Sequence, residues 1–240
     1  MIDVAFTRAG LLRCDVAVVI DVLRATSVAV QALQAGYERV LCAESVERAE
    51  ALRGPERVLA GERHCLPPAG FDQGNSPREA AVRRGRELVL ATTNGAPTIV
   101  AATRRAPKVL LGCLLNLDAV LRELGSQDLG ALAVTFVCSG TDRAVALEDV
   151  YVAGRLAAAL PGPRTDAAQV AEAVARNFAT PLAALGASAD AKALRASGLG
   201  DDIADCARES IFEFVPRVVS ARAGVAIVGG PGATSATPAR

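Results

Sequence analysis

The sequence predicts an α/β fold with three layers, in which a mainly parallel sheet with room for some antiparallel strands lies between two layers of helices. Short β-rich runs alternate with Ala- and Leu-rich helical stretches over the first two thirds of the chain, which is typical of repeated β-α units. The strand runs are continuously apolar, as strands buried on both faces are. With 240 residues, 51% of them hydrophobic, the chain has enough apolar material for one large core.

The expected elements follow one another at regular spacing. Strands are expected, in chain order, at residues 16–20, 39–42, 57–60, 87–91, 108–111 and 132–137. Helices are expected between and after them at 27–35, 46–52, 77–84, 96–104, 117–124 and 145–160. Each strand is thus followed by a helix, which is the arrangement that produces parallel strands.

Beyond residue 165 the strand signal fades. Helical segments are expected near 167–178, 190–197 and 202–208, followed by a short apolar run at 211–215. We interpret this part as a C-terminal helical region appended to the same domain. Residues 1–228 are therefore expected to form a single domain, and the Gly-, Pro- and Thr-rich residues 229–240 a flexible tail.

Composition excludes several classes of protein. The 26 basic and 26 acidic residues cancel, which does not suit a nucleic-acid surface or a polybasic membrane anchor. Asp3 and Arg8 interrupt the N-terminus where a signal peptide would be apolar. Six cysteines without a CxxC pair and a single histidine argue against a disulfide scaffold or a zinc site. We expect a cytoplasmic protein with neither nucleic-acid nor membrane partners, and a homo-oligomer as the default for a metabolic enzyme of this size.

Polar residues follow five of the predicted strands. These segments are Asp21 to Thr26, Gly61 to Arg63, Thr92 to Gly95, Gly112 with Asn116, and Cys138 to Asp142. Ligands of parallel sheets bind beyond the carboxyl ends of the strands, so these segments are expected to meet at one rim. Turn residues and helix caps would explain any single segment. Five together, with carboxylates and arginines among them, favour an anion site that also holds a hard cation.

Carboxylates at two places suggest a metal. Asp21 ends an apolar strand and must be neutralised by Arg24, Arg63 or a metal ion. Asp149 lies on the apolar stripe of the helix at 145–160, whereas Glu148 falls outside that stripe. Asp201 and Asp202 precede another helical turn, where they either cap it or add acid to a metal site. Magnesium, which prefers carboxylates, water and substrate oxygens, suits this set best.

The loop at residues 71–78 could hold an anion. Asn75 and Ser76 precede a helix that begins at Pro77, with Ser76 as its N-cap, although an ordinary capped loop has the same form. His64 is either a general acid or a polar loop residue. The chain lacks a GxxxxGK[ST] loop and a GxGxxG motif after a strand. Asp21 also lacks the second aspartate of a DxD phosphatase loop.

The same segments resemble a known family. The stretches that carry the resemblance are VIDVLRATS at 19–27, GER at 61–63, GFDQGNSP at 70–77, TTNG at 92–95, LED at 147–149 with Ala153-Gly154, and Asp201-Asp202. In this order, from about residue 15 to residue 215, the chain resembles the 2-phosphosulfolactate phosphatase family. It departs from the family's usual pattern at Cys65, Ala96 and Tyr151, which lie beside these motifs.

The resemblance implies a magnesium-dependent phosphatase that converts (2R)-phosphosulfolactate to sulfolactate and phosphate, a reaction on the route to coenzyme M. Asp21, Arg24 and Glu62 are expected to be catalytic. Metal ligands are expected at Asp21, Glu62, Asp149 and Asp201, with Asp202 as the alternative to Asp201, and substrate contacts at Arg63, Asn75, Ser76, Thr93, Asn94 and Gly95. Either water or Asp21 attacks phosphorus in this hypothesis.

Two alternatives stay open at this point. One is a phosphatase of another small phosphorylated 2-hydroxy acid. The other is an anion-binding domain without turnover, which the acids at positions 21, 62 and 149 argue against, because buried negative charge weakens anion binding.

Overall fold

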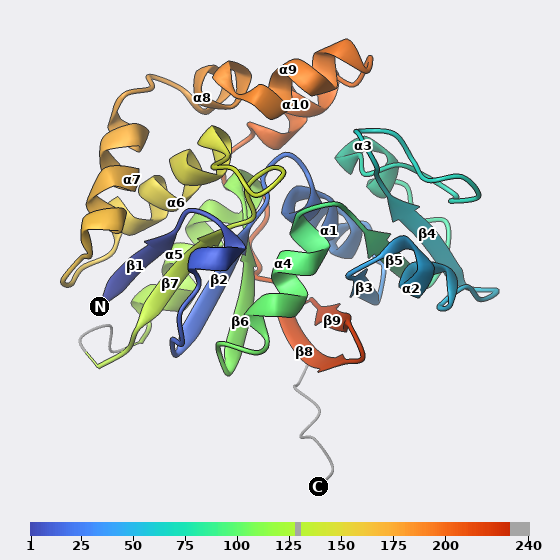
Figure 1. The fold of residues 1–240 in the computed structure, drawn as a ribbon, viewed down its shortest axis with the longest axis horizontal. Coiled ribbons are helices and arrows are strands. Elements are labelled where there is room, and N and C mark those ends of the chain that lie inside the picture. Colours follow the sequence, from blue (N-terminus) through green and yellow to red (C-terminus); the bar gives the residue numbers. More distant parts are fainter. Residues whose placement is uncertain (128–130, 231–240) are drawn as a thin grey trace, which may run out of the picture.

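The computed structural model describes residues 1–127 and 131–230, and within them a mixed sheet of nine strands runs through the centre of the molecule (Figure 1). The strands are β1 (Ile2–Ala5), β2 (Val16–Ile20), β3 (Arg39–Ala43), β4 (Arg57–Gly61), β5 (Glu87–Ala91), β6 (Lys108–Gly112), β7 (Val134–Cys138), β8 (Arg217–Arg222) and β9 (Val225–Gly229). Their order across the sheet is β1-β7-β2-β6-β8-β9-β3-β5-β4. The predicted α/β fold with a mainly parallel sheet is confirmed.

The helices alternate with these strands. They are η1 (Arg8–Gly10), α1 (Ala25–Gln34), α2 (Val46–Glu50), α3 (Pro77–Ala80), α4 (Gly95–Ala102), η2 (Leu114–Asn116), α5 (Leu117–Gly125), α6 (Leu147–Ala159), α7 (Asp166–Arg176), α8 (Pro181–Ala187), α9 (Ala189–Ala196) and α10 (Asp201–Cys206). Every strand and helix predicted before residue 160 coincides with one of these elements. The helix predicted at 77–84 ends early, at Ala80, because Val82 is exposed and no apolar stripe continues beyond it.

Two blocks of parallel strands make up the sheet. β1, β7, β2 and β6 form one block, and β3, β5 and β4 form the other. The hairpin of β8 and β9 joins them through three successive antiparallel pairings, so the blocks run in opposite senses across it. Because β6 and β8 pair only at Leu110 and Arg217, and because sheets twist, the two blocks can lean toward each other, as β1, β7 and β4 do in Figure 1.

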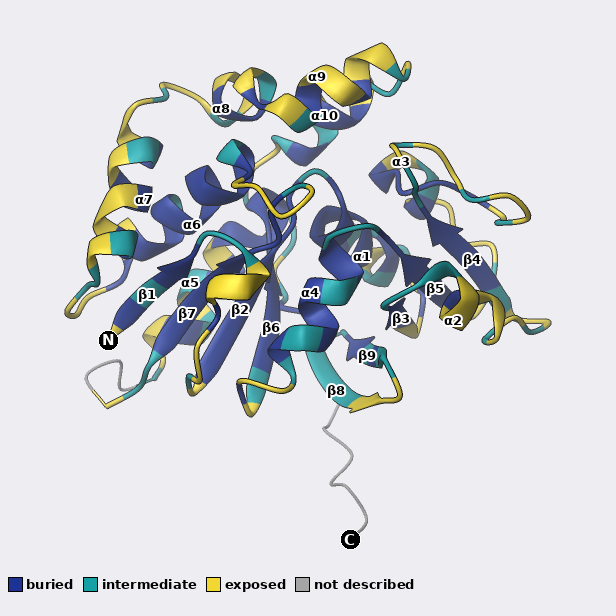
Figure 2. Cartoon of the chain, viewed as in Figure 1, coloured by how far each residue is buried: buried dark blue, intermediate teal, exposed yellow. Residues whose placement is uncertain are grey.

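Helices pack on both faces of the sheet. Along β2, Val16, Val18 and Ile20 face a core shared with α5, α6 and α7, while Ala17 and Val19 face a second core shared with α1 and α4. Figure 2 shows the strands largely buried, except for β8, and the outward faces of α7 and α9 exposed. No helix among the described residues is long and apolar enough to cross a membrane.

The C-terminal part differs from the prediction in one respect. The appended helical region is present as α7 to α10, but two strands that were not predicted, β8 and β9, follow it. β8 is half polar and only partly buried, so its sequence lacks the continuous apolar run of the other strands. Gly229, the first residue of the predicted tail, ends β9, and residues 231–240 lie outside the described part of the chain.

Gly154 lets α6 and α7 approach closely. A Cβ atom there would lie 2.0 Å from the carbonyl oxygen of Ala171 and 3.0 Å from the Cβ of Ala175. Both distances are too short for a side chain, so the two helices could not keep their present separation. α6 in turn contacts α8 of the C-terminal helical region.

We expect Gly154→Ala to lower the free energy of unfolding by about 1–3 kcal/mol, because the added methyl group overpacks this contact. Urea denaturation measures the change. Gly125→Ala in α5 is the matched control, since its Cβ would have no neighbour within 4 Å. Equal stability of the Gly154→Ala variant and the wild type would contradict the close packing.

Candidate active site

A cavity of about 380 Å³ lies beyond the carboxyl ends of β2, β4, β5 and β7 and beneath α9. Asp21 follows β2, Glu62 follows β4, and Thr93 and Asn94 follow β5. Four of the five predicted strand ends therefore meet at one place, although they belong to both blocks of the sheet. The fifth does not reach the cavity, because Asn116 after β6 is buried and its side chain binds backbone atoms at 3.0–3.3 Å.

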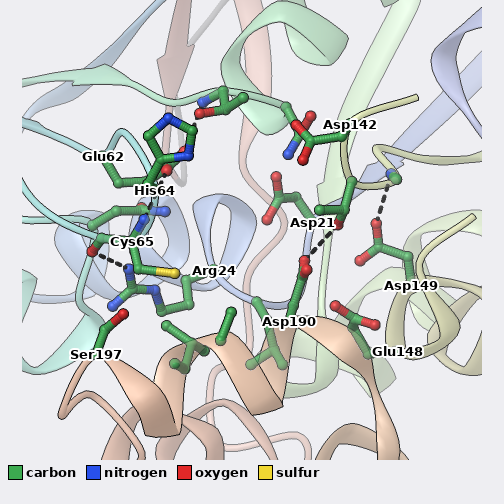
Figure 3. A pocket seen from close by; sticks show the side chains of 18 of the residues that line it. Asp21, Arg24, Glu62, His64, Cys65, Asp142, Glu148, Asp149, Asp190 and Ser197 are labelled. Carbon is green, nitrogen blue, oxygen red and sulfur yellow. Dashed lines mark hydrogen bonds between the residues drawn. The ribbon is translucent and has the colours of Figure 1, made fainter. Parts of the chain in front are cut away.

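Carboxylates gather on one side of the cavity (Figure 3). Asp21 and Glu148 are buried, at 8% and 2% exposure, and Asp190 from α9 faces them. The Asp21 Oδ1 atom accepts a hydrogen bond of 2.9 Å from the backbone N–H of Ala25 at the start of α1. Asp190 accepts a hydrogen bond of 2.6 Å from the hydroxyl of Thr141. This arrangement places three acidic side chains around a small volume.

Asp149 has a different part in the same region. Its Oδ1 atom accepts a hydrogen bond of 2.9 Å from the backbone N–H of Val22, and its Oδ2 atom accepts two, of 3.1 and 3.2 Å, from the N–H groups of Ser139 and Gly140. The side chain thus ties the loop after β2 to the loop after β7. As predicted it faces inward, but its oxygens are already engaged, whereas neighbouring Glu148 borders the cavity with a freer carboxyl group.

Burial and mutual repulsion raise the pKa values of these acids. Burial, Asp190 and Glu62 raise the pKa of Asp21 to about 7, against the opposing hydrogen bond from Ala25. Burial, Asp149 and Asp190 raise the pKa of Glu148 to about 10. Burial and the charge of Asp21 raise the pKa of Asp149 well above its ordinary value. The region therefore binds protons, or another source of positive charge, more strongly than exposed carboxylates would.

Arg24 supplies the positive charge on the other side of the cavity. Its Nη1 atom lies 2.5 Å from Asp202 Oδ2, and its Nη2 atom donates to the carbonyl of Cys65 at 3.2 Å. Asp202 also accepts a hydrogen bond of 2.7 Å from Ser76, so this carboxylate holds two predicted site residues at once. Asp201, by contrast, is exposed, does not line the cavity and pairs with Arg78 at 2.7 Å.

The remaining predicted residues divide between lining and support. Asn75 lines the cavity, and its buried Oδ1 atom has no hydrogen-bond partner among the described residues. Glu62 also lines it and accepts N–H groups from Thr93 at 2.7 Å and Cys65 at 3.4 Å. Arg63 does not line the cavity, and its guanidinium contacts the hydroxyl of Thr93 at 3.4 Å. Asn75 therefore has the greatest unmet capacity to bind a ligand.

Gly95 brings the start of α4 against Asp21. A Cβ atom at this position would lie 2.3 Å from Asp21 Oδ2 and 2.4 Å from the Cβ of Ala25. Only glycine leaves room for that oxygen. The residue predicted to contact substrate thus also shapes the space in which the Asp21 carboxylate sits.

Two tight turns border the cavity. His64 and Cys65 have φ angles of 51° and 69°, and Asp142 and Arg143 have almost the same pair, 49° and 69°. Antiparallel bridges flank both turns, between Arg63 and Leu66 and between Thr141 and Ala144. Positive φ at consecutive residues other than glycine is uncommon. His64 is exposed at the tip of the first turn and reaches the cavity wall.

Sequence reasoning missed Asp190 as a cavity residue, whereas Thr141 and Asp142 belong to a strand end that was expected at this rim. Asp190 lies in a helix that no strand-end argument addresses, and only the packing of α9 over the sheet brings it to Asp21. Glu148 was placed outside the apolar stripe of its helix, which is consistent with a side chain that borders the cavity instead of the core. Within residues 1–127 and 131–230, no three His, Cys, Asp or Glu side chains form a group that could hold a metal ion by themselves.

Comparisons with known proteins agree with the quoted motifs. The family model described as 2-phosphosulpholactate phosphatase matches residues 7–221. A protein of Thermus thermophilus named "probable 2-phosphosulfolactate phosphatase" is 41% identical over 220 residues, which cover 89% of this chain and 92% of that protein. Proteins with the same name from Pseudothermotoga lettingae and Deinococcus radiodurans are 35% and 38% identical, over 92% and 85% of this chain and 97% and 88% of theirs.

The buried acids determine how stability depends on pH. In the unfolded chain Asp21 and Glu148 would release their protons near 3.8 and 4.5, below their folded pKa values of about 7 and about 10. Between those limits the folded state holds protons that the unfolded state has lost. The free energy of unfolding therefore falls as pH rises, from about 4 to about 7 through Asp21 and from about 4.5 to about 10 through Glu148.

We expect Glu148→Gln to raise the melting temperature at about pH 8, in the absence of divalent cations, by roughly 2–4 °C for each kcal/mol of relief. The decline in stability with rising pH should also become shallower. Differential scanning fluorimetry across pH measures both. Glu50→Gln on the exposed face of α2 is the control and should behave as the wild type does. A Glu148→Gln variant that melts below the wild type at this pH would contradict the prediction.

Proposed function

This chain belongs to the 2-phosphosulfolactate phosphatase family of phosphoric monoester hydrolases, and from that membership we propose that it hydrolyses (2R)-phosphosulfolactate to sulfolactate and phosphate in a Mg²⁺-dependent reaction. The observation that carries the proposal is the cavity that sets Arg24 opposite Asp21, Asp190 and Glu148, with the side-chain amides of Asn75 and Asn94 in its wall. An anionic ester needs cationic and amide donors, and its hydrolysis needs carboxylates that hold a cation and move protons.

Arg24 is the residue that binds the phosphate. Its guanidinium is buried and fixed by Asp202, and paired N–H donors match the oxygens of a phosphate. Asn75 and Asn94 line the same cavity and add side-chain amides. The N-terminus of α1, which begins at Ala25, adds a favourable field for negative charge.

The carboxylates suit a hard divalent cation. Asp21 and Asp190 are the residues that would hold it, because they face each other and each raises the proton affinity of this region. Magnesium is commonly bound by one or two carboxylates together with water and substrate phosphate, so a third protein ligand is not required. When bound, Mg²⁺ supplies charge neutralisation for the phosphate oxygens and orientation of the attacking water. Asp149 positions this set through its three backbone hydrogen bonds instead of joining it.

Glu148 is suited to proton transfer. Its buried carboxyl group keeps its proton at neutral pH, and neutralisation of the neighbouring Asp190 would bring its pKa down toward the working range of an acid catalyst. Water adds to phosphorus, the bond from phosphorus to the ester oxygen breaks, and Glu148 donates the proton that the leaving alkoxide requires. Both protons of the water stay on the phosphate until one of them returns to the Glu148 carboxylate. Glu62, held by two backbone N–H groups, keeps the loop after β4 in place.

The direct test is phosphate release from (2R)-phosphosulfolactate and from other phosphorylated 2-hydroxy acids, each with Mg²⁺ and with EDTA. Metal-dependent release, fastest on the sulfonate ester, is the expected result. Release only from the other acids would move the function to another substrate of the same class. Tight, metal-independent anion binding without release from any ester would mean that the protein binds anions without turnover. The expected homo-oligomer and cytoplasmic location stay predictions.

We expect Asp21→Asn and Glu148→Gln to reduce kcat by at least about a hundredfold while the circular dichroism spectrum stays that of the wild type. The two should differ in metal response, because only Asp21→Asn removes a group that holds the cation. Raising Mg²⁺ should therefore recover part of the rate for Asp21→Asn alone. An unchanged rate in Asp21→Asn would remove this residue from the metal site.

Asp202 is expected to act through Arg24. Asp202→Asn should raise KM for the phosphate ester by about tenfold with a smaller change in kcat, since the ion pair that fixes the phosphate-binding guanidinium is lost. Asp201→Asn is a matched control one residue away, exposed and outside the cavity. If Asp201→Asn instead weakened the apparent affinity for Mg²⁺, Asp201 would be a metal ligand, as the sequence analysis expects, although it lies outside the cavity in the structure.

A further inference from the structure

A second cavity, of about 440 Å³, borders the first. The two share Thr93, Asn94 and Asp142 as walls. The other walls of the second cavity come from the segment Thr7 to Ala9, from Ser139 after β7 and from Arg143. The two cavities therefore adjoin at the loop after β5 and at Asp142.

The two cavities carry opposite charge. Arg8 and Arg143 face the second cavity, and neither has a carboxylate partner within 4.0 Å among the residues that the structure describes. Asp142 is the one acid among its wall residues. The first cavity, in contrast, is bordered by six acidic side chains, those of Asp21, Glu62, Glu148, Asp149, Asp190 and the shared Asp142. A second negative group of a substrate would be repelled by the acids of the first cavity and attracted by the arginines of the second.

The second cavity also contains a polar group that lacks a partner. Ser139 is 5% exposed, and its buried hydroxyl makes no hydrogen bond with any described residue. An unpartnered buried hydroxyl is costly unless a ligand or water satisfies it. The loop that carries Arg143 is well defined, since Thr141 and Ala144 exchange backbone hydrogen bonds of 3.1 and 2.8 Å across it. The guanidinium therefore extends from a fixed turn.

We propose that this second cavity binds the sulfonate of the substrate through Arg143 and Arg8, with the hydroxyl of Ser139 as a further donor, and so selects phosphate esters that carry a sulfonate. The inference rests on the proposed phosphatase function and adds residues that recognise the group distinguishing its substrate. It assigns the phosphate and the sulfonate to separate, adjoining cavities.

The donors favour a sulfonate over a second carboxylate. They come from three separate segments, η1, the residue after β7 and the turn at 141–144. A sulfonate presents three oxygens in a tetrahedral arrangement, which can accept from three directions. A planar carboxylate is best matched by the parallel N–H groups of one guanidinium. Two arginines and a serine on separate segments therefore suit the tetrahedral sulfonate better than a planar carboxylate.

The test compares three esters that share the phosphate and the C1 carboxylate and differ only in the substituent on C3. In 2-phosphosulfolactate this substituent is a sulfonate, in 2-phosphomalate it is a second carboxylate, and in 2-phospholactate it is a hydrogen atom. For Arg143→Gln we expect kcat/KM for the sulfonate ester to fall at least about tenfold, while that for 2-phospholactate stays within about twofold. The double variant with Arg8→Gln should fall further on the sulfonate ester only. Arg122→Gln, an exposed arginine of α5 outside both cavities, is the control.

Other outcomes are equally informative. Equal losses on all three esters, or no loss on the sulfonate ester, would overturn the proposed sulfonate site while leaving the phosphatase function intact. If the wild type releases phosphate from none of the esters, the proposed function fails by itself. Calorimetric binding of sulfolactate, with lactate as the reference, then tests whether the second cavity binds the sulfonate. Weaker binding of sulfolactate to Arg143→Gln than to the wild type supports the sulfonate site, and unchanged binding overturns it.

Discussion

Buried negative charge is the constraint on which the rest of this structure depends. Asp21, Glu148, Asp149 and Asp202 each have at most 8% of their surface exposed, and all lie within one region between the sheet and the C-terminal helices. Each would be costly to ionise without compensation. Asp149 is compensated by three backbone N–H groups, and Asp202 by Arg24 and Ser76. Among the described residues Asp21 accepts only one backbone N–H, and Glu148 avoids a buried charge by keeping its proton. The acids with the least compensation therefore lie where chemistry is proposed.

The connection between the two blocks of the sheet makes this concentration possible. A continuous parallel sheet would leave the ends of β4 and β5 several strands away from the end of β2. Here the hairpin of β8 and β9 pairs with β6 at only one position, and Glu62 and Asn94 line one cavity with Asp21 although their strands belong to the other block. The absence of a side chain at Gly95 then permits α4 to approach the Asp21 carboxylate. The cavity is thus a product of sheet curvature as much as of the loops.

The C-terminal helices complete the site by two contacts of different kinds. Asp190 from α9 faces Asp21 with a like charge, whereas Asp202 from α10 binds Arg24 with an opposite charge. The ion pair between Asp202 and Arg24 attaches the C-terminal helices to the loop after β2, and in this way it holds Asp190 over the cavity. The basic cavity beside Arg143 adjoins this acidic cavity. This division between an acidic and a basic cavity suits a small substrate whose anionic groups differ from one another.

The sequence by itself determined six strands and six helices between residues 16 and 160, because apolar runs of strand length and amphipathic helices follow from local patterning, but it did not predict the short edge strand β1. It also identified Asp21, Arg24, Glu62, Asn75, Thr93 and Asn94 as cavity residues, since the ends of successive strands are marked by polar residues. Only the tertiary structure decided which carboxylates stay free. Asp149 and Glu148 are neighbours on one helix, yet hydrogen bonds from Val22, Ser139 and Gly140 occupy the first and spare the second. Those donors lie in loops far away along the chain, as do the partners of Asp190 and Asp202, and local sequence carries no information about which distant groups will compensate a buried charge.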